Sequence, residues 1–187
     1  MQILAGKFKG RKLLPPRGRG TRPITAALKK SLFGTLGEGL DGCRVADLYC
    51  GTGTLGLEAL SRGAETCFFA ERDRGALAAL RRNIAELGVA DRSRIWSGDL
   101  LASARRRLAA AGELDVAFLD PPFADARRWD WADVTARLIS PLAETLAPDG
   151  VVALRVPTKV AVPETLSRLR VRRTKQFGGT VLVLLEL

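Results

Sequence analysis

Apolar residues recur along the chain in short runs that alternate with longer segments of helical spacing. The short runs predict strands at Arg44–Tyr49, Thr66–Ala70, Arg94–Ser97, Val116–Leu119, Val151–Val156 and Val181–Leu187. The longer segments predict helices at Thr54–Arg62, Arg74–Leu87, Leu100–Ala111, Ala132–Leu146 and Glu164–Leu169. Strands and helices in this alternation imply right-handed crossovers, so we expect an α/β fold with a mostly parallel sheet and helices on both faces.

The two ends of the chain depart from this alternation. Residues 2–14 hold two apolar-containing stretches around Gly6–Gly10 and predict a short hairpin, and Pro15–Gly20 predicts a linker. Thr25 is a suitable N-cap for the helix that follows. Gly178-Gly179 precedes the last strand and predicts a hairpin turn, so the sheet should end in an antiparallel pair.

The net charge of +10 is concentrated at the N-terminal end. Residues 1–30 hold nine Lys and Arg and no acid, whereas the rest of the chain is nearly balanced, with 21 basic and 20 acidic residues. A basic cluster of this kind is typical of a nucleic-acid contact, with a solvated basic tail as the alternative. We therefore predict that residues 1–23 form a basic hairpin and linker and that residues 24–187 form the main domain. The expected nucleic-acid contacts are Lys7, Lys9, Arg11, Lys12, Arg17, Arg19 and Arg22.

Composition excludes several classes of protein. No run approaches the roughly 18 apolar residues of a membrane helix, and the N-terminus carries charge where a signal peptide needs its apolar stretch. The three cysteines show no CxxC spacing, so we expect reduced thiols in a cytoplasmic protein. The chain has no histidine, which argues against Ser-His-Asp and Cys-His catalysis and against most transition-metal sites, so no metal is expected.

The first predicted strand runs into a glycine-rich loop, VADLYCGTGTLGLEAL. Gly51 and Gly53 allow a sharp turn and close approach of a ligand, and the following helix presents its positive N-terminal end. Dinucleotide-binding folds use similar loops, so the glycines alone do not choose the ligand. Asp47, four residues before Gly51, favours a ligand with a cationic amino group and would repel a pyrophosphate.

Two further acids end the next two predicted strands. Glu71 follows TCFFA, where a carboxylate can accept both ribose hydroxyls, as in NAD sites as well. Asp99 ends IWSGD, where it could accept from an adenine amino group. Each acid alone could instead cap a helix or a turn, but three at successive strand ends favour a nucleoside with a cationic substituent.

The fourth predicted strand leads directly into Asp120-Pro121-Pro122-Phe123. The prolines fix the backbone and remove two N–H donors, which leaves an acceptor-rich loop. Two fixed acceptors can hold the hydrogens of an exocyclic nucleobase amine while its lone pair points at an incoming methyl group. Phe123 offers an apolar face for the base to stack on. If the motif is considered alone, it could instead be a rigid turn in which Asp120 caps the backbone.

DLYCGTGTLGLEALSRGA, the N-terminal AGKFKGRKL with TRP following, and LDPPF together resemble the bacterial 16S ribosomal RNA guanine-N2 methyltransferases of the RsmD family. The likeness covers nearly the whole chain. It implies a Rossmann-like, seven-stranded class I methyltransferase sheet, S-adenosyl-L-methionine as cofactor and a guanine of the small ribosomal subunit as acceptor. We also expect a monomer. The chain departs from the family at Phe123, where Tyr is usual, and at Arg155, where an acid is common.

The resemblance assigns roles by position. It matches Asp47, Gly51 and Gly53 to the cofactor loop, Glu71 to the ribose, Asp99 to the adenine, and Asp120, Pro121, Pro122 and Phe123 to catalysis. The remaining members of the expected cofactor site are Tyr49, Arg72 and Leu100.

The sequence also leaves three other functions open. The same motif would suit an amino-methyltransferase that acts on adenine N6 or on a protein glutamine. The chain could also be an inactive RNA-binding ribosome-assembly factor, or a nicotinamide dehydrogenase, which Asp47 and the Asp-Pro-Pro motif disfavour.

Overall fold

The computed structural model describes residues 1–15, 24–37 and 39–187. They build one sheet in the order β3-β2-β1-β4-β5-β8-β7-β6. The first five strands in this order pair in parallel and the remaining pairs are antiparallel. The strands are β1 (Arg44–Leu48), β2 (Thr66–Glu71), β3 (Ser93–Ser97), β4 (Leu114–Leu119), β5 (Leu146–Pro157), β6 (Thr165–Leu166), β7 (Leu169–Phe177) and β8 (Thr180–Glu186).

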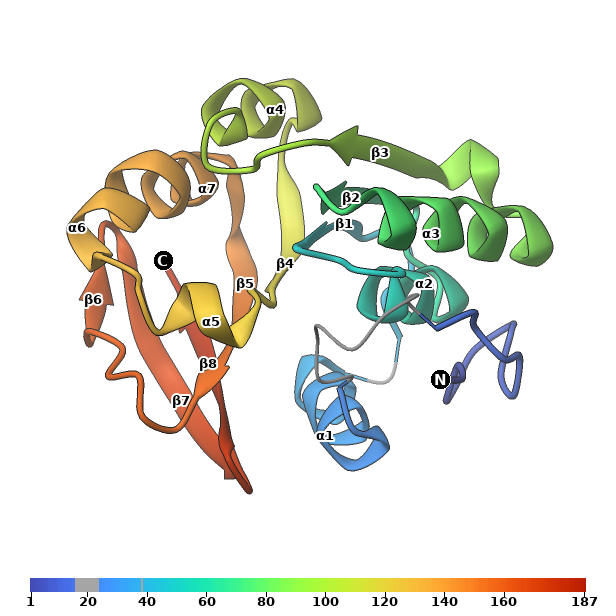
Figure 1. The fold of residues 1–187 in the computed structure, drawn as a ribbon, viewed down its shortest axis with the longest axis horizontal. Coiled ribbons are helices and arrows are strands. Elements are labelled where there is room, and N and C mark those ends of the chain that lie inside the picture. The colour runs from blue at the N-terminus through green and yellow to red at the C-terminus, as the bar shows by residue number, and fades with distance from the viewer. Residues whose placement is uncertain (16–23, 38) are drawn as a thin grey trace.

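Helices cover both faces of this sheet (Figure 1). One face packs on α1 (Ala26–Leu36), α2 (Thr54–Ser61) and α3 (Arg74–Leu87). The other packs on α4 (Ala104–Ala111) and on a helical stretch that consists of α6 (Trp131–Val134), a π-helical turn (Thr135–Ile139) and α7 (Ser140–Thr145). The short helices are η1 (Ala90–Arg92) and α5 (Phe123–Ala126). The expected α/β fold with an antiparallel C-terminal hairpin is confirmed.

Alternation along each strand explains why both faces are apolar. In β1, Val45 packs against the α1–α3 side, while Ala46 and Leu48 pack against the α4–α7 side. In β4, Val116 and Phe118 face the first side and Ala117 and Leu119 the second. Because both faces are buried, the central strands are almost continuously apolar, as in other parallel sheets.

One predicted helix is wrong. Residues 164–169 form the two-residue strand β6 and the start of β7, joined by a tight turn at Ser167, whose φ of 59° lies in the left-handed region. Leu166 and Leu169 are buried, and their three-residue spacing, which would also suit one face of a helix, places them opposite each other across the turn. The sheet therefore has eight described strands, where seven were expected.

The N-terminal residues fold back on themselves as predicted. Ile3 N–H donates to the Arg11 carbonyl at 3.0 Å, Gly10 N–H donates back to Ile3 at 2.9 Å, and Gln2 bridges Lys12. Gly6 approaches α2 so closely that a Cβ atom there would lie 1.8 Å from the Ser61 carbonyl oxygen. This hairpin is thus docked on the domain, with Ile3 fully buried.

Within the described ranges, no helix has the length and apolar character needed to cross a membrane. The three cysteines are free thiols, and Cys50 and Cys67 are buried.

Candidate active site

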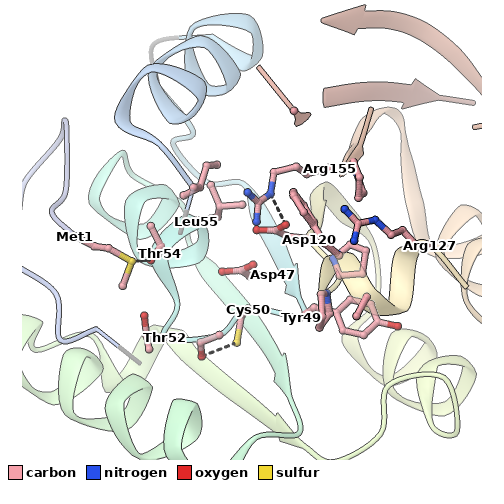
Figure 2. A pocket seen from close by; sticks show the side chains of 18 of the residues that line it. Met1, Asp47, Tyr49, Cys50, Thr52, Thr54, Leu55, Asp120, Arg127 and Arg155 are labelled. Atoms are coloured by element: carbon pink, nitrogen blue, oxygen red, sulfur yellow. Dashed lines mark hydrogen bonds and ion pairs between the residues drawn. The ribbon is translucent and has the colours of Figure 1, made fainter. Parts of the chain in front are cut away.

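A pocket of about 590 Å³ opens at the carboxyl ends of β1, β4 and β5 (Figure 2). The order of the strands reverses between β1 and β4, which is where open α/β sheets bind their ligands. The glycine-rich loop lines one side, the Asp120–Phe123 loop and Arg155 line the other, and Met1 and Ile24 contribute from the N-terminal region.

The glycine-rich loop has a backbone conformation that would be strained if Gly53 were replaced by a residue with a side chain. Gly53 is the N-cap of α2 with φ 83°, and a Cβ atom there would lie 2.5 Å from Leu80. Tyr49 also has a left-handed φ, 63°, which for a non-glycine residue stores strain of about 1–3 kcal/mol. Strain of this kind often marks a ligand-binding turn, and the Tyr49 backbone lies where β1 becomes the loop.

Asp47 lies at the floor of the pocket. Its side chain is buried and accepts a hydrogen bond from the Gly56 N–H of α2 at 2.7 Å. Burial raises the pKa of this carboxyl to about 7, and the nearby carboxylates of Asp120 and Glu71 act in the same direction. A cationic group entering the pocket would offset this penalty and favour the ionised form.

Glu71 organises the same loop from the end of β2. Its carboxylate accepts hydrogen bonds from the N–H groups of Gly51 at 2.8 Å, Arg72 at 2.7 Å and Asp73 at 2.8 Å. A carboxylate offers about four lone-pair positions, so these bonds fix its orientation and leave acceptor capacity. Glu71 is therefore fixed beside the glycine-rich loop by backbone donors.

Asp99, Arg72 and Leu100 have structural contacts in addition to their expected roles. Asp99 caps the turn before α4 by accepting from Ala102 N–H at 3.1 Å. The Arg72 side chain pairs with Asp125 of α5 at 2.9 Å, and Leu100 is buried in the core. The described lining of the pocket includes none of these three, nor Glu71, so their cofactor contacts remain predictions.

Asp120 follows the last residue of β4 and extends the pairing of β4 with β1 by one hydrogen bond. Its N–H donates to the Leu48 carbonyl of β1 at 3.2 Å. Its carboxylate accepts from Nε of Arg155 on β5 at 2.5 Å, and the two side chains are 17% and 11% exposed. Burial raises the pKa of Asp120, while the Arg155 charge and hydrogen bond act against that rise. The guanidinium also lies over the Phe123 ring, 5.0 Å from its centroid. Asp120, Arg155 and Phe123 thus form one connected group in the pocket.

Sequence reasoning missed three buried polar residues that hold this region together. Arg155 departs from the family pattern, but no local signal in the sequence links it to Asp120. Asn83 of α3 donates to the Thr52 carbonyl of the glycine-rich loop at 3.0 Å and accepts from Leu14 N–H at 2.8 Å. Glu58 of α2 binds the N-terminal hairpin through the N–H groups of Leu4 and Ala5.

The described cations of the basic cluster include Lys7, Lys9, Arg11 and Lys12, which are all exposed. Arg17, Arg19 and Arg22 lie outside the described residues. Lys29, which was counted in the basic cluster, is instead buried against Glu58 at 2.9 Å and cannot contact a polyanion.

Trp129 and Trp131 pack against the protein. Trp129 lies 6.3 Å from the Tyr49 ring and 5.4 Å from Trp131, whose indole N–H donates to the Ala161 carbonyl at 2.9 Å. In the part of the chain that the structure covers, no group of three or more metal-binding side chains is found.

Known proteins resemble this chain in both sequence and fold. The model of the family described as "Conserved hypothetical protein 95" matches residues 1–186. The chain belongs to this family. It is 34% identical over 184 residues to the "Putative rRNA methyltransferase YlbH" of Bacillus subtilis, with 96% of this chain and 95% of that protein covered.

A curated relative and a solved structure, both from Escherichia coli, extend the comparison. "Ribosomal RNA small subunit methyltransferase D" is 35% identical over 124 residues, which cover 66% of this chain and only 60% of that protein. The solved structure titled "Putative methyltransferase yhhF from Escherichia coli" superposes with a TM-score of 0.79 at 29% identity and covers 99% of this chain and 96% of that one. The resemblance to the RsmD family is thereby confirmed.

Proposed function

We propose that the protein transfers a methyl group from S-adenosyl-L-methionine to the exocyclic N2 amine of a guanine in small-subunit ribosomal RNA. The observation that carries this proposal is the placement of Asp120, with the rigid Pro121-Pro122 turn, in the same pocket as Asp47 and the glycine-rich loop. The names of the relatives support a methyltransferase that acts on ribosomal RNA.

The residues on the glycine-loop side fit the proposed cofactor. Asp47 is a buried carboxylate that lines the pocket and would pair with the cationic amino group of the methionine moiety. Glu71, oriented by three N–H donors, would accept from the ribose hydroxyls, and Asp99 and Leu100 would lie toward the adenine. When bound, the cofactor supplies an electrophilic methyl group. The remaining residues of the proposed cofactor site are Gly51, Gly53, Tyr49 and Arg72.

Asp120 would act on the acceptor. Its carboxylate would accept a hydrogen bond from the N2 amine. As this nitrogen bonds to the methyl carbon, the bond from that carbon to the sulfonium sulfur would break and leave S-adenosylhomocysteine, and Asp120 would take up the proton that the nitrogen releases. The Pro121 carbonyl would hold the second amine hydrogen, and Pro122 keeps the loop rigid. Because nitrogen gains positive charge in the transition state, an ionised Asp120 stabilises that state more than the ground state.

Phe123 would contribute in a way that differs from the simple stacking platform expected from the sequence. One face of its ring already lies under the Arg155 guanidinium. A guanine that enters the pocket would therefore either stack on the remaining exposed part of the ring or share the ring with Arg155, which itself offers a planar surface for stacking.

A methylation assay tests the proposal. Wild-type protein, labelled S-adenosyl-L-methionine and small-subunit RNA, free or in particles, should give N2-methylguanine on nucleoside analysis. N6-methyladenine as the product would overturn the guanine assignment and leave the cofactor site standing. Failure of the protein to bind S-adenosyl-L-methionine in calorimetry would overturn the whole proposal, including the role of Asp47.

The exposed cations of the N-terminal hairpin would bind RNA phosphates. The triple substitution Lys7→Gln, Lys9→Gln and Lys12→Gln should weaken RNA binding. It should also flatten the salt dependence of that binding by roughly 0.7–0.9 for each phosphate that a lysine no longer neutralises. Cofactor affinity should not change. Binding titrations at several salt concentrations measure the slope.

Two features of the structure shape this experiment. Deleting the hairpin would also remove buried Ile3 and the partners of Glu58, so substitution of exposed side chains is the cleaner change. The matched control is a triple substitution of exposed arginines on the α4–α7 side, Arg105→Gln, Arg106→Gln and Arg137→Gln. A slope that changes equally in both triple variants would mean that the hairpin has no specific phosphate contacts.

A further inference from the structure

Arg155 forms an ion pair with Asp120 that the proposed function leaves without a role. Arg155 comes from β5 and Asp120 from the end of β4, two strands that pair in parallel, and Nε and Oδ1 lie 2.5 Å apart. Both side chains are largely shielded from water, so the contact acts in a medium that screens charge poorly. The Phe123 ring lies against the guanidinium and restricts its movement.

We propose that Arg155 is a positioning residue that keeps Asp120 ionised and oriented toward the acceptor amine. This inference rests on the proposed function, because it assigns Asp120 the amine. The geometry supports it in two ways. First, the Nε–Oδ1 hydrogen bond fixes the orientation of the carboxylate, which has about four lone-pair positions and can still accept an amine hydrogen. Second, both side chains line the same pocket as Asp47.

A balance of charge explains why the pocket needs this cation. Asp47 and Asp120 both face the pocket, and like carboxylates close together disfavour a second negative charge. An arginine guanidinium stays protonated at all working pH values, so it is a dependable counter-charge for the carboxylate that must accept a proton. The other charged and titratable groups that line this pocket are Tyr49, Cys50, Arg127, Lys159 and the amino terminus at Met1. Glu71 lies outside this lining and acts on Asp47.

A carbon-13 NMR titration of the Asp carboxyl groups tests the inference without any turnover. In Arg155→Gln, the titration of Asp120, assigned through Asp120→Asn, should move to higher pH by roughly 1–3 pH units, because an opposite charge in contact has been removed. Arg155→Lys retains the charge and should keep Asp120 close to its wild-type titration. Arg127→Gln, which removes another cation from the same pocket, should move it much less.

Single-turnover methyl transfer then tests the consequence for the reaction. Asp120 must be ionised, so activity is lost as pH falls through its pKa, and this acid limb should move upward in Arg155→Gln. At a pH below the Asp120 pKa of both proteins, Arg155→Gln should transfer methyl groups about tenfold more slowly than wild type for each pH unit by which the Asp120 pKa rises. Arg155→Lys should restore most of the rate. Arg105→Gln, which removes an exposed ion pair between α4 and α7, should leave the pH profile unchanged.

The outcomes separate this inference from the proposed function. An unchanged Asp120 titration in Arg155→Gln, or faster methyl transfer by that variant, would overturn the role of Arg155 while the methyltransferase stands. A wild-type protein that binds S-adenosyl-L-methionine but methylates neither RNA nor particles would overturn the proposed function, and with it the positioning role, whatever the titration shows.

Discussion

Asp120→Ala should nearly abolish methyl transfer while cofactor and RNA binding remain close to wild type. The proposed role of Asp120 is to hold and then receive a proton from a nitrogen that becomes positive in the transition state. Loss of such a group lowers the rate by roughly 100- to 10,000-fold. The ground-state contact is weaker, so binding should change little. Single-turnover transfer at saturating RNA and cofactor measures the rate, and calorimetry and RNA titration measure binding.

A more conservative variant distinguishes the chemistry from a structural effect. Asp120→Asn preserves the shape of the side chain and an acceptor oxygen, so it should be less impaired than Asp120→Ala, although it cannot take up a proton. Both variants remove the ionic partner of Arg155, so thermal unfolding must show that each remains folded. Full activity in Asp120→Ala would exclude the proposed mechanism.

The parallel sheet and its strand-end acids could be predicted because both depend on local pattern. Central strands are continuously apolar, and their carboxyl ends must meet at one edge of the sheet. Asp47 and Asp120 end adjacent strands and do reach one pocket. A strand-end acid can also cap the next turn, and Asp99 accepts from the Ala102 N–H in this way. Its expected contact with the adenine stays a prediction.

The wrong helix has a physical reason. Two leucines three residues apart fit one face of a helix and fit equally well the two sides of a tight hairpin. What separates the two structures is the left-handed backbone at Ser167 and the pairing of β7 with β8, and the pairing joins residues far from this segment. A short apolar segment contains too little information to decide between them.

The buried polar contacts could not be predicted because their partners are distant in sequence. Arg155 lies 35 residues from Asp120, and Glu58 lies 54 residues from Leu4. The composition also suggests, wrongly, that Lys29 belongs to the exposed basic cluster. A lysine in a basic stretch is ordinarily a solvated charge, yet the α1 helix turns this one toward Glu58, and burial lowers its pKa against the opposing effect of that carboxylate.

The network centred on Glu58 joins the N-terminal hairpin to the methyltransferase-like fold. The Glu58 side chain is fully buried and accepts from Leu4 N–H at 2.8 Å and Ala5 N–H at 3.0 Å. It also pairs with Lys29 at 2.9 Å and with Arg62 at 3.0 Å. One carboxylate therefore satisfies two backbone donors and two cations, so its removal leaves several buried groups without an acceptor.

Glu58→Ala should destabilise the protein by roughly 3–5 kcal/mol, because breaking a buried ion pair leaves an uncompensated charge at Lys29. The matched control is Glu144→Ala, which breaks an exposed pair with Arg105 and should change stability by less than about 1 kcal/mol. Lys29→Met combined with Glu58→Leu removes both charges and should recover part of the stability.

Urea unfolding measures the free energy of unfolding of each variant. In Glu58→Ala, limited proteolysis should cut first within the released hairpin. A destabilisation no larger than that of Glu144→Ala would mean that the Glu58 network does not hold the hairpin to the fold.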